Sequence, residues 1–326
     1  MSQPVVAILG TRYEDLAIEE QVLEPLGVAF VVDDGAGPAE IVAAAGRADV
    51  ILAGSRPRFT ADVISRLRAK GIVRYGIGTE AIDLDAARQA GIAVARVSDY
   101  GTEAVAFHAV SLAVTQLRRI VDADRSVRAG EWGVAAVRPL HLPSTLTAGI
   151  IGYGRIGRQV ARCLAGLGFA VCAFDQYVTV PDGDRVASVS LEDLLERSDV
   201  VSLHVPGRPD GRPLLDASRL AAMKPGSVLV NTARGSLVDV PALVAGLAAG
   251  RPGRAALDVY PQEPPDLTAF ADVADRVLLT PHMAWYTEES EVDLRRKAAQ
   301  EVVRLLRDEP LRDPVVETDA GGRGDT

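Results

Sequence analysis

Three polar residues that could carry chemistry follow predicted strands in the second half of the chain. Arg234 lies in SVLVNTARG, Glu263 in RAALDVYPQEPP and His282 in RVLLTPH. Arginine binds a carboxylate through two parallel hydrogen bonds. Histidine can exchange a proton with a reacting oxygen near neutral pH, and a paired glutamate would favour the imidazolium form. Each residue alone is commonly structural or solvated, but together they suit hydride transfer to an oxo acid.

A glycine-rich loop precedes these residues and fits a dinucleotide site. Gly152-Tyr-Gly154-Arg-Ile-Gly157 follows an apolar strand and opens a helix, which is the context that the G-x-G-x-x-G pattern requires. The helix N-terminus would offer N–H groups to a pyrophosphate. Asp175 ends the next strand, where its carboxylate could accept hydrogen bonds from ribose hydroxyls and would repel a 2′-phosphate. We therefore predict NAD as the cofactor.

A second glycine pair has a similar spacing and a similar place between a strand and a helix. Gly76 and Gly78 also follow a strand and precede a helix, but Arg96 stands where a ribose-binding acid would be expected. We predict no dinucleotide site there. The exposed amides of this loop, next to Arg74, suit a small anion better.

The bulk composition excludes several classes of protein. The chain has 326 residues and a net charge of −9, so it can form two domains and a nucleic-acid partner is not expected. No apolar run approaches the roughly 18 residues that span a membrane, and MSQPVVAILG does not resemble a signal peptide. Cys163 and Cys172 have neither C-x-x-C nor zinc-like spacing, and the histidines have no partners at metal-ligand spacing. We expect reduced cysteines, no metal and a cytoplasmic location.

The chain alternates between strand and helix patterns, which predicts an α/β protein with parallel sheets. A long helical segment over 102–122 has apolar residues on more than one face and could lie between two domains. A second amphipathic helix is predicted over 288–308. The first block of alternation, before residue 98, has strands expected over 5–10, 28–32, 49–54, 72–76 and 92–97; the second block runs over 146–282.

The motifs GYGRIGRQVA, SLHVP, MKPGSVLVNTARGSLVD, AALDVYPQEPP and LLTPHMAWYTEE resemble the D-isomer-specific 2-hydroxyacid dehydrogenases, over roughly residues 45–308. DYGTEAVAFH and AWYTEE are most similar to the branch of the C-terminal-binding-protein corepressors and related bacterial enzymes. The resemblance implies two doubly wound parallel-sheet domains joined by long hinge helices. A flavodoxin-like substrate domain would comprise 1–98 plus 287–314, an inserted Rossmann NAD-binding domain 99–286, and a mobile tail 315–326.

The resemblance also implies roles for individual residues. Arg234 would hold the substrate's carboxylate and carbonyl, His282 would be the acid/base, and Glu263 would pair with it. Four residues, besides Arg234 and His282, would bind the substrate: Arg74, Ile77, Gly78 and Trp285. Cofactor contacts would come from the glycine loop and from strand ends, namely Gly152, Tyr153, Gly154, Arg155, Ile156, Gly157, Asp175, His204, Val205, Pro206, Asn231, Thr232, Ala233, Asp258 and His282.

The expected activity is NAD-dependent interconversion of a 2-oxo acid and a D-2-hydroxy acid, by a homodimer that pairs through the NAD-binding domain. Two alternatives stay open: an NAD(H)-sensing, corepressor-like protein with little turnover, or a dehydrogenase for a phosphono-substituted acid, formate or phosphite. The sequence departs from the family pattern at the loop after Pro206. Arg208 and Arg212 there are either solvated or bring positive charge to a doubly charged acid.

Overall fold

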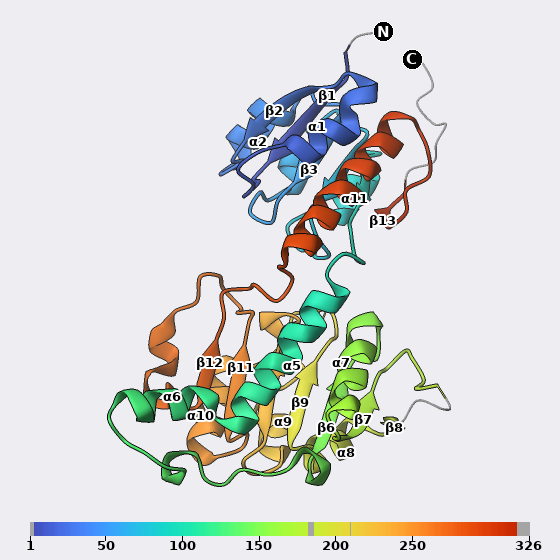
Figure 1. Ribbon diagram of the computed structural model, residues 1–326. Helices are drawn as coiled ribbons and strands as arrows, with labels where there is room; N and C mark the ends of the chain where they lie inside the picture. Colours follow the sequence, from blue (N-terminus) through green and yellow to red (C-terminus); the bar gives the residue numbers. More distant parts are fainter. Residues whose placement is uncertain (1–2, 182–185, 209, 318–326) are drawn as a thin grey trace. The chain divides into compact units, whose positions relative to one another are not determined.

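The computed structural model describes residues 3–181, 186–208 and 210–317. The chain divides into two compact units (Figure 1). We call Met1–Gly101 with Thr287–Thr326 the terminal unit, because both ends of the chain form it, and Thr102–Tyr286 the central unit.

The terminal unit contains a six-stranded sheet with the order β2-β1-β3-β4-β5-β13. Its first five strands are parallel, and their order is the flavodoxin-like one. The strands are β1 (Val5–Leu9), β2 (Ala29–Asp33), β3 (Val50–Ala53), β4 (Gly71–Arg74), β5 (Ala93–Ala95) and β13 (Pro314–Val316).

Strand β13 differs from the sequence prediction. Val315 and Val316 belong to the predicted mobile tail, but they form an edge strand because their backbone pairs antiparallel with β5. Residues 318–326 of the predicted tail lie outside the described residues.

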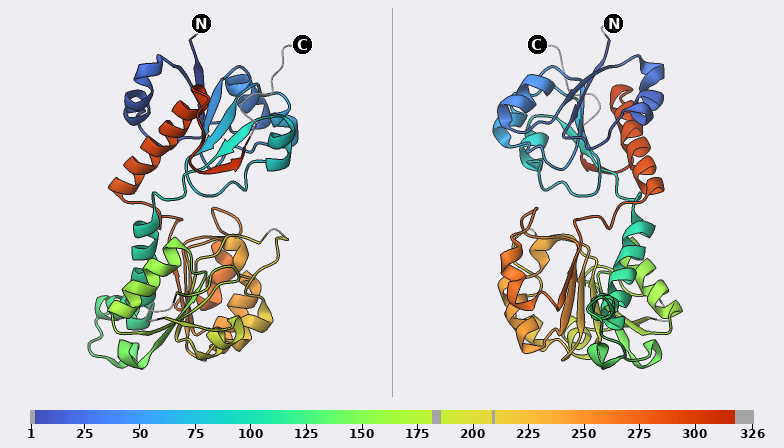
Figure 2. Two further views of the ribbon diagram at one scale, coloured as in Figure 1. Left: turned by 90° about the vertical axis from the view of Figure 1, so that its right-hand side faces the viewer. Right: turned by 60° about the vertical axis from the view of Figure 1, so that its left-hand side comes forward.

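Helices cover both faces of this sheet (Figure 2). Ala7 and Leu9 on β1 pack into one apolar cluster with Ile41, Val63 and other residues of the helices on that face, because alternate strand residues point to opposite faces. That face carries α2 (Pro38–Ala45), α3 (Ala61–Ile64) and α4 (Leu84–Gln89), and the other face carries α1 (Ala17–Leu23) and α11 (Glu288–Leu306).

The central unit contains a seven-stranded, wholly parallel sheet with the order β8-β7-β6-β9-β10-β11-β12. This is the Rossmann order with a seventh strand added. The strands are β6 (Thr147–Ile151), β7 (Ala170–Phe174), β8 (Val186–Ser188), β9 (Val200–Leu203), β10 (Val228–Asn231), β11 (Arg254–Leu257) and β12 (Val277–Leu279).

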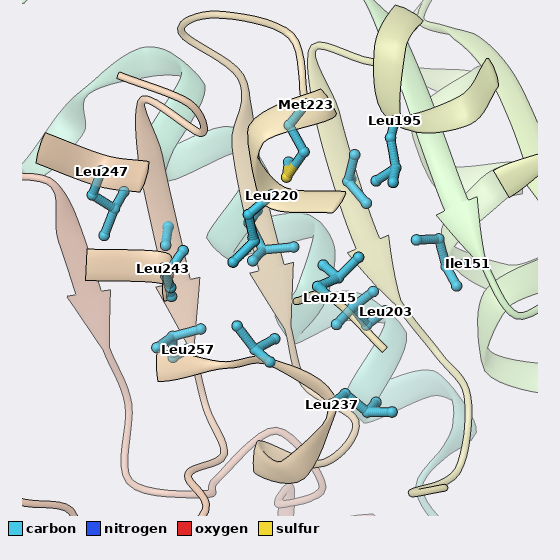
Figure 3. Close-up of a cluster of buried hydrophobic side chains, with 14 of the residues drawn as sticks. Ile151, Leu195, Leu203, Leu215, Leu220, Met223, Leu237, Leu243, Leu247 and Leu257 are labelled. Atoms are coloured by element: carbon cyan, nitrogen blue, oxygen red, sulfur yellow. The ribbon is translucent and has the colours of Figure 1, made fainter. Parts of the chain in front are cut away.

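The core of the central unit lies on both sides of its sheet. Ile150 packs toward α5 (Thr102–Arg118) and α7 (Arg155–Gly166), whereas its neighbour Ile151 faces the opposite side. That side holds a leucine-rich cluster between the sheet and three helices (Figure 3). These helices are α8 (Leu191–Arg197), α9 (Ala217–Ala222) and α10 (Val240–Ala249).

The predicted long helix over 102–122 is two helices. α5 ends at Arg118, Arg119 adopts a left-handed φ of 54°, and α6 (Ile120–Arg128) follows. Among the described residues no single helix is long and apolar enough to cross a membrane, although α5 and α6, bent by 55°, pass that test as a pair. Short 3₁₀ helices complete the chain: η1 (Glu24–Leu26), η2 (Ala135–Val137), η3 (Pro143–Thr145), η4 (Gly235–Leu237) and η5 (Leu267–Val273).

Polar side chains fix the starts of most of these helices. The residues before α3, α4, α8, α9, α10 and α11 are serine, threonine or aspartate, and each accepts a backbone N–H of the first turn, which satisfies one of the four donors left open there. Helix α7 is different: Gly154 is its N-cap, and no side chain caps it. The first turn of α7 is therefore not closed by a capping side chain.

Candidate active site

The glycine loop between β6 and α7 has a separate steric reason for each glycine. Gly152 has a φ of 96°, and a Cβ there would lie 2.5 Å from the His204 carbonyl oxygen. A Cβ on Gly157 would lie 1.9 Å from the Gly152 carbonyl oxygen, so this glycine lets the helix approach the strand. A Cβ on Gly154 would meet nothing within 4 Å. The protein itself does not require glycine at 154, but a bound pyrophosphate would.

Asp175, which was predicted to bind the ribose, also holds the glycine loop in place. Its Oδ2 accepts the Tyr153 N–H at 2.6 Å, and its Oδ1 accepts the N–H groups of Tyr177 and Val178 at 2.8 and 3.0 Å. The carboxylate ties the end of β7 to the glycine loop and remains half-buried. Because a carboxylate has about four acceptor sites, it keeps capacity for a ribose hydroxyl.

The remaining loop residues divide between core and surface. The Tyr153 ring is 1% exposed and packs in the core, so only its backbone can face a ligand. Arg155 is exposed and Ile156 half-buried in the first turn of α7. Arg158, which the sequence prediction did not include, donates to the Tyr153 carbonyl at 3.0 Å and lies over the Tyr153 ring.

His204 follows β9 and meets the glycine loop from the neighbouring strand. Its Nε2 lies 2.8 Å from the Ser202 hydroxyl, and burial lowers its pKa from 6.5 to about 3. The ring is therefore neutral near neutral pH. Val205 packs close to Gly152, and Pro206 is exposed.

The loop after β10 positions Arg234. The Asn231 side chain spans the loop: it accepts the Ala233 N–H at 3.0 Å and donates to the Arg234 carbonyl at 2.8 Å. Asn231 thereby holds the backbone of the loop rather than pointing away from it. The buried Thr232 hydroxyl has no hydrogen-bond partner among the described residues, which is unusual for a buried polar group.

Gly235 brings the Arg234 loop against the loop that follows β11. A Cβ on Gly235 would lie 1.9 Å from the Tyr260 carbonyl carbon. Sequence reasoning did not assign a role to this glycine, although its place directly after Arg234 was a signal. The close approach fixes the path of the chain that carries Arg234 relative to the chain that carries Glu263.

Asp258, at the end of β11, is the centre of a hydrogen-bonded network. It is fully buried, and its carboxylate accepts the Thr280 hydroxyl at 2.6 Å and the N–H groups of Met283 and Ala284 at 2.9 Å. Burial alone would raise the pKa of Asp258, but bonds from His108, Thr280 and these backbone groups lower it. The ionised carboxylate thus holds both sides of the His282 loop.

His282 and Glu263 are brought together as predicted from their types. The His282 Nδ1 lies 2.7 Å from the Glu263 Oε2, and the other carboxylate oxygen accepts the Tyr260 N–H at 3.2 Å. Both side chains remain partly exposed, at 47% and 39%. His282 adopts a left-handed φ of 54°. With Nδ1 directed at the carboxylate, Nε2 is the nitrogen left to meet a ligand.

Three residues of this network were not predicted as site residues: His108, Tyr260 and Thr280. His108 on α5 lies 3.2 Å from the Thr280 hydroxyl and 3.6 Å from the Asp258 carboxylate. Tyr260 donates to the carbonyl oxygens of Thr280 at 2.9 Å and Leu257 at 3.1 Å. His108 is 174 positions before His282, so nothing local in the sequence pointed to it. Thr280 and Tyr260 each lie two positions from a predicted residue.

The other predicted substrate residues lie in both units. Trp285 is half-buried in the central unit, and its ring contacts Tyr286 edge to face. Arg74, Ile77 and Gly78 lie at and just beyond the end of β4 in the terminal unit, where all three are half-buried. The Arg74 guanidinium donates to the Tyr75 carbonyl and approaches the Ala53 carbonyl at 3.5 Å.

The loop after Pro206 does not supply an obvious positive site. Arg208 pairs with Asp210 at 2.9 Å, and both are exposed; Arg212 is exposed as well.

No group of three histidine, cysteine, aspartate or glutamate side chains within the described parts of the chain could hold a metal ion.

Comparison with known proteins agrees with this geometry. Residues 110–284 match the family described as "D-isomer specific 2-hydroxyacid dehydrogenase, NAD binding domain". Two relatives are D-3-phosphoglycerate dehydrogenases. The one from Archaeoglobus fulgidus is 33% identical over 89% of this chain and 55% of its own length; the one from Escherichia coli K12 is 36% identical over 77% and 62%. The chain thus spans little more than half the length of these relatives.

Solved structures are similar over nearly the whole chain. The apo-structure of D-lactate dehydrogenase from Escherichia coli has a TM-score of 0.82 and 30% identity, covering 96% of this chain and 100% of its own. D-lactate dehydrogenase from Aquifex aeolicus, complexed with NAD and lactic acid, has a TM-score of 0.86 and 26% identity with the same coverage. The predicted branch stays a prediction. The chain belongs to the D-isomer specific 2-hydroxyacid dehydrogenase family, and its central unit carries the family's NAD-binding domain.

Proposed function

We propose that this protein is an NAD-dependent dehydrogenase that interconverts a 2-oxo acid and the corresponding D-2-hydroxy acid. The observation that carries the proposal is the His282–Glu263 pair, whose Nδ1 and Oε2 lie 2.7 Å apart. A carboxylate that fixes one imidazole nitrogen leaves the other to act as acid or base on a substrate oxygen.

The cofactor fits the central unit for three reasons. Helix α7 begins without a capping side chain, the space beside Gly154 is open, and the buried Thr232 hydroxyl has no partner among the described residues. The N–H groups at the start of α7 would hold the pyrophosphate, Asp175 the ribose, and Thr232 and Asp258 would lie toward the nicotinamide. Bound NADH would supply the hydride to the carbonyl carbon.

The protein's own residues would then place the acid and manage the proton. Arg234 would bind the substrate carboxylate and polarise the neighbouring carbonyl, with the amides of Ile77 and Gly78 binding the same carboxylate. Protonated His282 would donate from Nε2 to the developing alkoxide while Glu263 stabilises the imidazolium. Trp285 and Arg74 would contact the rest of the substrate. Orientation and charge stabilisation would account for most of the rate.

We also propose that the protein acts in the cytoplasm as a homodimer. Support for the dimer comes from a run of exposed apolar side chains over the segment from α5 to η3, among them Phe107, Trp132 and Leu142. Exposed apolar groups in such number are typical of an interaction surface.

The test is NADH oxidation with a panel of 2-oxo acids. The panel would include pyruvate, 2-oxoisocaproate, a dicarboxylic and an aromatic oxo acid, and phosphorylated and phosphono members. We expect one class to turn over, and His282→Ala to lower kcat by about 10² to 10⁴, the usual contribution of a general acid.

The fall in kcat can be assigned to proton transfer only if His282→Ala still binds NADH. NADH affinity of His282→Ala, measured by fluorescence, should stay within a few fold of the wild type. If NADH binds tightly to the wild-type protein yet no acid, nor formate or phosphite with NAD, turns over above the His282→Ala background, the dehydrogenase proposal fails and cofactor sensing becomes the better account.

A further inference from the structure

A buried ion pair in the terminal unit joins α1 to α11. Arg295 on α11 donates from Nε and Nη2 to Glu19 on α1, at 3.0 and 2.7 Å. Glu19 is fully buried and Arg295 is 6% exposed. The same guanidinium also donates to the Asp15 carbonyl at 2.7 Å and approaches its carboxylate at 3.1 Å. A single arginine therefore fixes the chain before α1, α1 itself and α11.

The ion pair continues to the end of β4 through one tyrosine. The Tyr75 hydroxyl donates to the Glu19 Oε1 at 2.8 Å, and its ring is 6% exposed. Burial and the Glu19 carboxylate raise the pKa of Tyr75 well above its ordinary value, so the hydroxyl stays a donor. Tyr75 lies next to Arg74 in the chain and two positions before Ile77.

Aromatic contacts close this cluster on one side. The Arg295 guanidinium lies 4.5 Å from the centre of the Tyr13 ring, and Tyr13 meets Tyr75 edge to face with ring centres 5.3 Å apart. Each of the three side chains in the series Tyr75–Glu19–Arg295 therefore contacts more than one neighbour, and these contacts fix its orientation.

The loop beyond β4 lies outside regular structure and is held by the Tyr75 side chain and by a few backbone hydrogen bonds. The Tyr75 N–H donates to the Ala53 carbonyl at 2.9 Å and the Gly76 N–H to the Arg74 carbonyl at 2.9 Å. Gly76 then adopts a φ of 127°, which is accessible to glycine alone without strain. After this turn Ile77 and Gly78 lie between β4 and α4, in neither a helix nor a strand. The buried Tyr75 side chain is therefore a fixed point beside them, together with the hydrogen bond from the Val97 N–H to the Gly76 carbonyl at 3.1 Å.

Stability alone gives a weak reason for a charged network here. Burying an ion pair costs so much desolvation that apolar residues of similar volume are often equally stable. Such a pair instead fixes orientation. The bidentate Arg295–Glu19 contact and the Tyr75–Glu19 hydrogen bond together hold the three side chains in one arrangement.

We propose that Tyr75, Glu19 and Arg295 form a positioning network for the substrate-carboxylate loop, residues 74–78. The inference rests on the proposed function, because it assumes that the amides of Ile77 and Gly78 bind the carboxylate of the oxo acid. Tyr75 sets where these amides lie, Glu19 holds Tyr75, and Arg295 orients Glu19. None of the three touches the reacting atoms.

The decisive variant is Tyr75→Phe, which keeps the ring and removes one hydrogen bond. We expect the KM for the best 2-oxo acid to rise about fivefold, the change that corresponds to the net contribution of one hydrogen bond. Both kcat and the KM for NADH should stay within about twofold. Hydrogen exchange of the peptide containing residues 75–79 should accelerate in the free protein, in a measurement that needs no substrate. Glu19→Gln, which keeps an acceptor for Tyr75, should give the same split to a smaller degree.

A matched control separates positioning from stability. Val63 is fully buried on the opposite face of the same sheet, so Val63→Ala should lower the melting temperature without changing the KM ratio or the exchange of residues 75–79. If Tyr75→Phe changes KM no more than Val63→Ala does while the wild type turns over, the positioning inference is wrong and the network is only structural. If the wild type turns over no acid, the proposed function has failed; unchanged exchange of 75–79 in Tyr75→Phe would then overturn the network's role independently.

Discussion

At the scale of single residues, the site depends on His282 being held in an unfavourable backbone conformation. A non-glycine residue in the left-handed region costs about 1 kcal/mol or more. The network around Asp258 offsets this cost, because its carboxylate accepts the two N–H groups that follow His282. Thr280 and Tyr260 fix the preceding side of the same loop. The geometry of the proposed catalytic histidine is therefore set mainly by Asp258, which was predicted to contact the cofactor, and by Thr280 and Tyr260, which were assigned no function.

Glu263 provides the simplest test of charge at the site. Glu263→Gln keeps the shape of the side chain but removes the negative charge that faces the imidazole Nδ1. We expect kcat for reduction of the oxo acid to fall by about tenfold to a hundredfold, at the lower end of general-acid effects, because the pair is partly exposed and solvent weakens it. Steady-state kinetics at pH 7 would measure this. Gln262→Ala, one position earlier, should leave kcat unchanged, and an equal kcat for Glu263→Gln and wild type would contradict the role of the charge.

His204 predicts a specific loss of stability in acid. Its pKa is lowered from 6.5 to about 3 in the folded protein, so below pH 6.5 the unfolded chain binds a proton that the folded one does not. The contribution is present above pH 6.5 and is lost as the pH falls toward 3. Between pH 7 and pH 5 this amounts to about 2 kcal/mol.

Urea unfolding at the two pH values would measure that loss. In His204→Gln, which can still contact Ser202, the decrease between pH 7 and pH 5 should be smaller by about 2 kcal/mol than in the wild type. Equal decreases in the two proteins would show that His204 takes up its proton without unfolding.

At the scale of elements, the glycine loop contains one glycine that the fold itself requires, Gly157, and one that only a bound ligand would require, Gly154. A Cβ at Gly154 meets no protein atom, whereas one at Gly157 collides with the Gly152 carbonyl. Gly154→Ala should therefore change the free energy of unfolding by no more than about 0.5 kcal/mol yet raise the Kd for NADH at least about tenfold, because the methyl group enters the pyrophosphate space. Fluorescence titration and urea unfolding would give both numbers.

The control for this prediction lies on the same helix. Gly166 on α7 also has open space around its Cβ position, and Gly166→Ala should alter neither NADH affinity nor stability by much. Should Gly154→Ala bind NADH as tightly as Gly166→Ala does, the pyrophosphate would not lie against this loop.

Local patterns predicted most elements because strand and helix periods were clear. Strand β6 and helix α7 lie on either side of the glycine loop, as predicted. The break between α5 and α6 was not predicted, because Arg119 gives no local signal for a left-handed conformation. Asp122, in the first turn of α6, pairs with Arg119 and also with Arg254, which lies more than 100 positions later in the chain. Strand β13 was missed for a similar reason, since three residues pair with a strand more than 200 positions earlier.

At the scale of the whole molecule, βαβ alternation predicted the parallel sheets, and the family resemblance implied the fold of each unit. Most of the candidate site residues could also be predicted, because they lie in sequence motifs just beyond the ends of strands. The two polar networks were not predicted. His108 in the central unit, and Arg295 and Tyr75 in the terminal unit, lie in no recognised motif, and only their hydrogen-bond partners show their roles. Buried polar groups need partners, but a sequence does not say which ones.

The exposed apolar side chains of the central unit predict the state of assembly. Phe107, Trp132 and Leu142 are 71%, 93% and 69% exposed, and they lie in the segment through which we propose that two copies pair. Burying such groups against a second copy would stabilise a dimer by the hydrophobic effect. Analytical ultracentrifugation at micromolar concentration should give twice the 34.4 kDa of one chain.

Charge introduced into this segment should separate the copies. We expect the double variant Trp132→Glu/Leu142→Glu to sediment as a monomer, because carboxylates are costly to bury at an interface. Leu267 is also exposed, at 59%, but lies on η5 outside the segment, so Leu267→Glu should remain a dimer. A wild-type monomer would exclude the dimer itself, whereas a dimer that tolerates both charges would place the interface on another surface of the chain.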